Sequence, residues 1–175
     1  MQRSIPRWQI GGFIFTSILG TFLHFLFDWT GQSVVAALFS AVNESIWEHL
    51  KLLYFPMVIF ALWEYFRWGQ TEKGFWQVAL SGILLGLLLI PVLYYTYTGI
   101  FGVNIDWLNI TIFFVTAAAS FYMQAKLFAR PRHRQLQKWI PVFLIVAIGV
   151  LFIVFTFLPP QIPFFRDPAT GSYGF

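Results

Sequence analysis

Long apolar stretches alternate with short polar segments along the chain, and this pattern predicts membrane-spanning helices. Five mainly apolar stretches lie at about residues 9–28, 44–67, 74–97, 106–128 and 138–158. An α-helix needs about 20 such residues to cross roughly 30 Å of hydrocarbon. We therefore expect an all-α integral membrane protein with a single transmembrane domain of five helices over residues 1–175.

The first stretch follows Arg3 and Arg7, as the apolar region of a secretory signal peptide follows basic residues. In a signal peptide that region is only about 7–15 residues long, and a small-residue cleavage site comes after it. The stretch from Ile10 to Phe27 is longer, and no such site follows it. We therefore expect an uncleaved first helix.

The connections between the stretches carry structural signals of their own. Residues 33–42 are apolar, but ten residues are too few to span a bilayer, so we expect an interfacial or re-entrant segment. Asn43 is a typical N-cap residue, which would place Glu44 in the first turn of the second helix. Gly82 and Gly86 have the GxxxG spacing that lets membrane helices approach closely.

Two features are expected within the second helix. Pro56 removes a backbone donor in mid-helix and predicts a kink. Glu64 and Arg67 are three residues apart near the far end of this helix, and this spacing favours an ion pair.

Lysine and arginine collect in alternate connections, and this bias predicts the orientation of the chain in the membrane. The N-terminus and the loops at 67–73 and 126–138 are basic, whereas the connections at 28–43 and 98–106 contain neither residue. We therefore expect the N-terminus on the inner side and the C-terminal tail, residues 159–175, on the outer side.

The 126–138 loop is strongly basic, with Lys126, Arg130, Arg132, His133, Arg134 and Lys138. Its simplest interpretation is a topology signal on the inner side. A contact with anionic lipid is the alternative interpretation.

Composition supports the membrane assignment and excludes several kinds of site. Hydrophobic residues make up 58% of the chain and charged residues 10%, whereas about a quarter of a soluble domain is charged. The net charge of +4 reflects the basic loops, so we expect the lipid bilayer rather than nucleic acid as partner. The chain has no cysteine, which excludes disulfides, thiol nucleophiles and cysteine-ligated zinc.

Ionisable residues gather between positions 24 and 51, close to the expected outer face. His24 and Asp28 are four apart and share a face of the first helix. Glu44 and Glu48 have the same spacing on the second. His24 and Glu48 each lie about 6 Å deeper than the other member of the pair, at 1.5 Å per residue. Ionisable side chains are costly in hydrocarbon and usually turn inward, so we expect an outward-facing polar pocket between these two helices.

The residue types in this cluster suit a divalent metal such as zinc, which binds imidazole nitrogen and carboxylate oxygen. The predicted ligands are His24, Asp28, Glu48 and His49. Glu48 and His49 point about 100° apart on a helix, so both reach one ion only if it lies between them. With Glu44 or Glu48 as general base, the cluster predicts a metal-dependent, hydrolase-like enzyme that acts on a small or lipid-like substrate.

Two other functional interpretations use the same region. Ser45, His49 and Asp28 are arranged as a nucleophile, a base and an orienting acid would be. Alternatively, the carboxylates and imidazoles bind a cation or proton in a transport component. The outer mouth of that component would be lined by Asp106, Asn109 and the tyrosines Tyr94, Tyr95 and Tyr97.

A structural interpretation needs no ligand. Asp28 then belongs to a turn, and Glu44 complements a helix N-terminus. Lys51 either pairs with Glu48 or extends its ammonium group to the membrane surface. In that case the protein is a structural or partner-binding membrane protein, and the cluster only holds the first two helices together.

The C-terminal tail carries a separate expectation. Residues 161–165 are apolar and bounded by prolines, so solvent exposure would be unfavourable. We expect an ordered tail that covers the mouth of the pocket, with Arg166 and Asp167 meeting Asp28 or Lys51 at its rim.

Several motifs resemble a family of small multi-pass bacterial membrane proteins of unknown function. They are His24-Phe-Leu-Phe-Asp28-Trp29, Asn43-Glu44-Ser45-Ile46-Trp47-Glu48-His49-Leu50-Lys51, and the tail motifs at 162–168 and 171–174. The resemblance covers nearly the whole chain. It implies a location in the bacterial cytoplasmic membrane and does not imply an activity.

Overall fold

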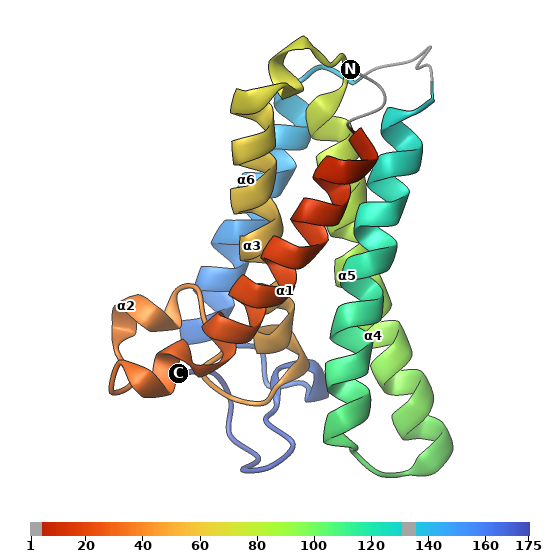
Figure 1. The fold of residues 1–175 in the computed structure, drawn as a ribbon. Coiled ribbons are helices and arrows are strands. Elements are labelled where there is room, and N and C mark those ends of the chain that lie inside the picture. Colours follow the sequence, from red (N-terminus) through yellow and green to blue (C-terminus); the bar gives the residue numbers. More distant parts are fainter. Residues whose placement is uncertain (1–4, 131–135) are drawn as a thin grey trace.

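The computed structural model describes residues 5–130 and 136–175, which form a bundle of helices (Figure 1). The helices are α1 (Ile5–Trp29), α2 (Val34–Ala37), α3 (Ile46–Arg67), α4 (Phe75–Phe101), α5 (Asp106–Phe128) and α6 (Trp139–Phe157), with 3₁₀ turns at Gly69–Thr71 and Pro163–Phe165. All but α2 are long and apolar enough to cross a membrane, which confirms five spans. Within the described ranges the only β-pairing is an isolated bridge between Arg166 and Tyr173.

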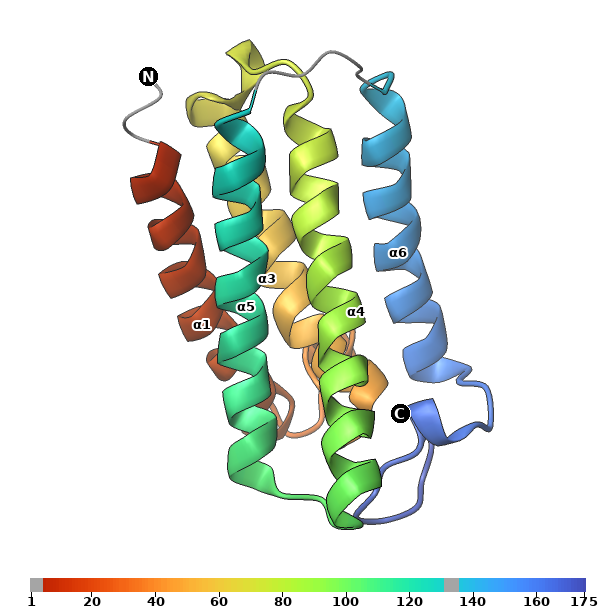
Figure 2. The same ribbon diagram turned by 90° about the vertical axis from the view of Figure 1, so that its right-hand side faces the viewer.

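Helix α3 is the central helix of the bundle. In its most apolar window 61% of the residues are buried inside the protein, against 28–39% for the other four spans. It packs against α1, α4 and α6, and α5 completes the bundle beside α1 and α4 (Figures 1 and 2). Because α3 faces protein more than lipid, it can bury ionisable side chains such as Glu48, Lys51 and Glu64 inside the bundle.

The start of α3 differs from the prediction. The helix begins at Ile46 and its N-cap is Ser45, whose hydroxyl accepts a hydrogen bond from the backbone N–H of Glu48. Asn43 instead closes a turn before the helix, with its side-chain oxygen accepting from the N–H of Ser45. As a result Glu44 lies in the loop before the helix, and its side chain reaches His49 on the helix.

The small residues of α4 allow close helix packing, as their spacing predicts. A Cβ atom at Gly82 would lie 2.2 Å from Nε2 of Gln124 on α5. A Cβ atom at Gly86 would lie 2.4 Å from Leu53 on α3 and 2.9 Å from the hydroxyl of Ser120. Glycine therefore permits α4 to approach both neighbours. The same helix continues to Phe101, four residues beyond the predicted end.

The expected pair of Glu64 with Arg67 does not form. Glu64 is buried and its Oε1 accepts a hydrogen bond of 2.8 Å from Nε2 of Gln9 on α1. Arg67 is exposed at the end of α3. The two side chains do not meet, because Glu64 points toward α1 inside the bundle and Arg67 points outward.

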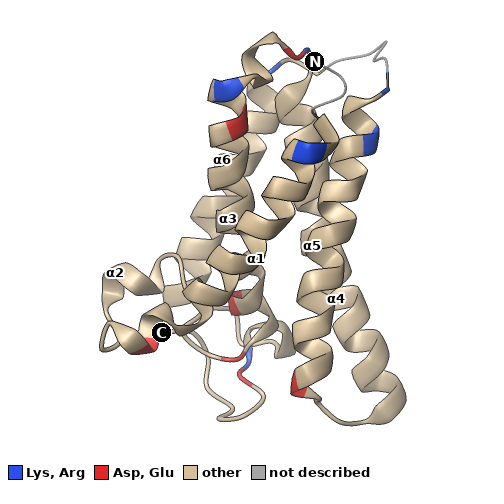
Figure 3. Cartoon of the chain, viewed as in Figure 1, with Lys and Arg blue, Asp and Glu red and all other residues tan. Residues whose placement is uncertain are grey.

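Charged residues are divided between the two ends of the bundle (Figure 3). One end has Arg7 at the start of α1, Arg67 and Lys73 around the α3–α4 turn, and Lys126 near the end of α5. The opposite end carries α2, the α4–α5 loop and the C-terminal tail (Figure 1). Arg132, His133 and Arg134 of the basic loop lie outside the described residues.

Candidate metal centre

His24, Glu44 and His49 converge at the end of the bundle that carries α2. His24 comes from the last turns of α1, Glu44 from the loop before α3, and His49 from the first turn of α3. One ligand atom from each side chain lies within 4.8 Å of the others. The packing of α1 against α3 therefore brings two imidazoles and one carboxylate together from three segments of the chain.

The backbone fixes the orientation of the His49 ring. Its Nδ1 lies 2.9 Å from the carbonyl oxygen of Ser45, so we assign the Nδ1 proton to this bond. Nε2 lies 3.4 Å from Oε2 of Glu44, to which it donates a hydrogen bond when the ring is protonated; in the neutral ring it offers a lone pair to a metal. Metal-binding histidines usually donate their other N–H to a carbonyl or carboxylate in this way.

The spacing of His49 and Glu44 matches that of two ligands of a tetrahedral metal ion. Two ligand atoms, each about 2.0–2.2 Å from a zinc ion, lie about 3.4 Å apart at the tetrahedral angle. The separation of His49 and Glu44 is 3.4 Å. The rings of His24 and His49 are 5.3 Å apart at their centroids, and Nδ1 of His24 is buried without a hydrogen-bond partner among the described residues.

Electrostatic interactions favour the negatively charged form of Glu44, which is the form that binds a cation. The hydrogen bond from His49 holds the pKa of the Glu44 carboxyl below its usual range, while partial burial acts in the opposite direction. This side chain is about half exposed, so a ligand can reach the centre from outside the bundle. The result is a set of two imidazoles and a carboxylate, which resembles catalytic zinc sites in its donor atoms.

Glu48 is directed toward α6 and away from this set. Its Oε2 forms an ion pair of 2.5 Å with Nζ of Lys51 and accepts a bond of 3.1 Å from the N–H of Val42. Its Oε1 accepts a hydrogen bond of 3.0 Å from the hydroxyl of Thr156 on α6. Both carboxylate oxygens of Glu48 are therefore bonded to partners other than His24 and His49.

Lys51 is completely buried, and all three of its N–H groups have partners. Besides Glu48, it donates to the carbonyl oxygen of Ala37 at 2.9 Å and to the hydroxyl of Thr156 at 2.8 Å. Of the two alternatives for Lys51, the structure has the ion pair with Glu48 and not an ammonium group extended to the membrane surface. We call Glu48, Lys51, Thr156 and the Ala37 carbonyl the clasp, because together they join α2, α3 and α6.

The other predicted site residues lie around these two groups. Asp28 is exposed one turn beyond His24, within electrostatic range of it but outside the three-residue set. Ser45 does not form the nucleophile of a triad, because His49 bonds its carbonyl oxygen and its hydroxyl caps the helix. Sequence reasoning missed Thr156, which no motif marks.

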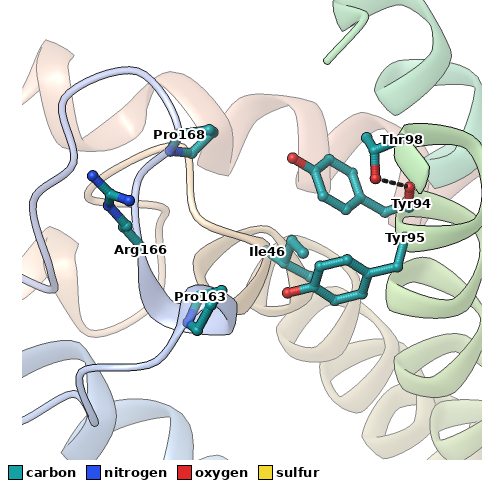
Figure 4. Close-up of a pocket in the computed structure, with 7 residues that line it drawn as sticks. All are labelled: Ile46, Tyr94, Tyr95, Thr98, Pro163, Arg166 and Pro168. Carbon is teal, nitrogen blue, oxygen red and sulfur yellow. Dashed lines mark hydrogen bonds between the residues drawn. The ribbon is translucent and has the colours of Figure 1, made fainter. Parts of the chain in front are cut away.

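The residues predicted for an outer mouth divide into separate groups. Asp106 is exposed in the first turn of α5, and the side chain of Asn109 bonds Tyr97 and Asn104 at the α4–α5 connection. Tyr94 and Tyr95 line a cavity of about 280 Å³ instead, together with Ile46, Thr98, Pro163, Arg166 and Pro168 (Figure 4).

The C-terminal tail folds back onto the bundle. Phe165 is buried against Trp47 of α3, and the N–H of Phe175 donates to the carbonyl oxygen of Thr156 at 2.8 Å. The expected contacts of Asp167 with the rim are not formed. Its carboxylate accepts from the backbone N–H groups of Ala169 and Thr170 within the tail.

The fold and these sites define a multi-pass membrane protein with a His–Glu–His cluster at one end of its bundle. The chain belongs to DUF6512, a family of unknown function, whose family model matches residues 1–175. No curated protein and no solved structure matched the chain.

Proposed function

We propose that the protein is a metal-dependent membrane enzyme of the hydrolase type. The observation that supports this best is the 3.4 Å spacing of Glu44 and His49, completed by His24 within 4.8 Å. A divalent ion such as zinc would be held by these three side chains. At such a site zinc keeps one position open for water and lowers the pKa of that water toward neutrality.

The surrounding residues suit hydrolysis of an ester-like bond. Water adds to the acyl or phosphoryl centre, the bond to the leaving oxygen breaks, and the protons of the water end on the two products. Glu44 belongs to the proposed ligand set, and Glu48 belongs to the clasp. Asp28 is a nearby carboxylate that belongs to neither group. We assign it the role of proton acceptor.

We also propose which end of the bundle faces the inner side and in which membrane the protein lies. Excess Lys and Arg at the end with the α3–α4 turn favours that end as the inner side. The His–Glu–His cluster then faces outward. We propose the cytoplasmic membrane of a bacterium as the location, in line with the resemblance of the sequence motifs, and a lipid-like or small-molecule substrate.

Elemental analysis and zinc titration of the purified protein test the metal centre. We expect about one zinc per chain, and loss of most of it in His24→Ala and Glu44→Gln with the fold retained. Asp106→Asn is the matched control, because it removes an exposed carboxylate at the same end without touching the cluster. Equal zinc content in all variants would contradict the proposal.

A second experiment distinguishes hydrolytic activity from zinc transport. Zinc-loaded protein in detergent should hydrolyse a short-chain ester or phosphodiester, and Asp28→Asn should slow this about 100-fold or more while zinc remains bound. Zinc flux into proteoliposomes without hydrolysis would instead indicate a transport component.

A further inference from the structure

We propose that the cavity between α4 and the C-terminal tail binds the anionic headgroup of a phospholipid, with an acyl chain along α4. The cavity of about 280 Å³ has Tyr94 and Tyr95 on one wall and Pro163 and Arg166 on the other (Figure 4). Ile46, at the start of α3, lies between the two walls. The cavity thus offers two tyrosine hydroxyls above an apolar surface, and the guanidinium of Arg166 lies at its rim, beside Gly171 of the tail (Figure 4).

Charge supports an anionic occupant. Arg166 is exposed, and within residues 5–130 and 136–175 its guanidinium forms no ion pair with a carboxylate. Lys51, the other cation described at this end, is fully engaged in the clasp. The hydroxyls of Tyr94 and Tyr95 add two donors on the opposite wall. Guanidinium groups bind phosphate through paired N–H donors.

The surface below the cavity fits an acyl chain. Leu84, Leu88, Val92 and Tyr95 are spaced four, four and three residues apart, so they form one stripe along α4. Their side chains are 45–61% exposed. From Leu84 to Tyr95 the helix rises about 16 Å, close to the roughly 15 Å of one hydrocarbon leaflet. A free phosphate ion would use the cavity only, whereas a lipid uses the cavity and the stripe.

This site also bears on the substrate of the candidate metal centre. Ile46 in the cavity and His49 in the cluster are three residues apart, and such residues lie on the same side of a helix. If the proposed function holds, the substrate class is a phospholipid-like ester whose headgroup lies beside the metal. That extension rests on the proposed function, but the lipid site itself does not.

Native mass spectrometry of the chelator-treated protein in detergent tests the lipid site. We expect phosphatidylglycerol to bind about tenfold or more tightly than phosphatidylcholine with the same chains. Arg166→Gln should remove this preference, and Tyr94→Phe with Tyr95→Phe should reduce it. Arg67→Gln, an exposed arginine at the opposite end, should retain it.

Several outcomes would overturn the lipid site. They are an equal loss of preference in Arg67→Gln, no loss in Arg166→Gln, or inorganic phosphate at the same concentration displacing the lipid fully. As a second measurement, phosphatidylglycerol with a photoreactive group in mid-chain should label Leu88 or Val92, and labelling elsewhere alone refutes the acyl path. His24→Ala distinguishes the two proposals, because it should lose zinc and keep lipid binding.

Discussion

Removing Lys51 should destabilise the protein strongly, because it leaves a buried carboxylate without its counter-ion. In Lys51→Met the side chain keeps a similar length but loses three N–H donors, which bond Glu48, Thr156 and the carbonyl of Ala37. Glu48 is 1% exposed and cannot regain water. Breaking a buried ion pair in this way costs about 3–5 kcal/mol.

The matching change on the partner gives a sharper test. Glu48→Gln leaves the Lys51 ammonium buried without a counter-ion and should also cost about 3 kcal/mol. The double variant Glu48→Gln with Lys51→Met removes both charges and keeps a neutral amide that can accept from Thr156. We expect the double variant to lose less unfolding free energy than the two single variants lose in sum, by about 2 kcal/mol or more.

Reversible unfolding in mixed micelles, followed by tryptophan fluorescence, measures these free energies. Lys73→Met is the control, because Lys73 is exposed at the opposite end and should change stability by less than about 0.5 kcal/mol. A cost below about 1 kcal/mol for Lys51→Met, or strictly additive single changes, would refute the clasp.

Three further expectations follow from packing and topology. Gly86→Ala should cost about 1–3 kcal/mol, because its Cβ atom would lie 2.4 Å from a leucine of α3, whereas Gly99→Ala meets nothing within 4 Å and should be neutral or stabilising. Phe165→Ala should cost about 3 kcal/mol and leave zinc binding unchanged, as judged by thermal unfolding and zinc titration. Reporter fusions should read outside after Phe175 and inside at Lys73, and an inside signal at the C-terminus contradicts the outward-facing centre.

The five spans were predictable from sequence because membrane thickness fixes the length and polarity of a spanning helix. The same rule predicted that residues 33–42 do not span, and the structure forms only a four-residue helix there. Helix α3 was the least apolar span and yet the most central. Hydropathy measures contact with lipid, so a helix surrounded by protein gives a weaker signal.

The geometry of the polar cluster depends on the residue at which α3 begins, and helix propensities alone do not determine that residue. Starting the second helix at Glu44 places that side chain on the helix, four residues from Glu48. The helix begins two residues later, so Glu44 stays in the loop and reaches His49. The partners of Lys51 were hidden for another reason. Ala37 contributes a backbone carbonyl, and Thr156 is 105 residues away in sequence.

Glu48 and His49 are adjacent, and their divergence by about 100° assigns them to different neighbours. Glu48 meets Lys51 and α6, whereas His49 meets α1. For both to bind one ion, α3 would have to rotate by about half that angle. Such a rotation breaks the buried bonds of the clasp and also the bond between His49 and the Ser45 carbonyl. The clasp therefore sets the rotation of α3, and this rotation directs His49 toward Glu44 and His24.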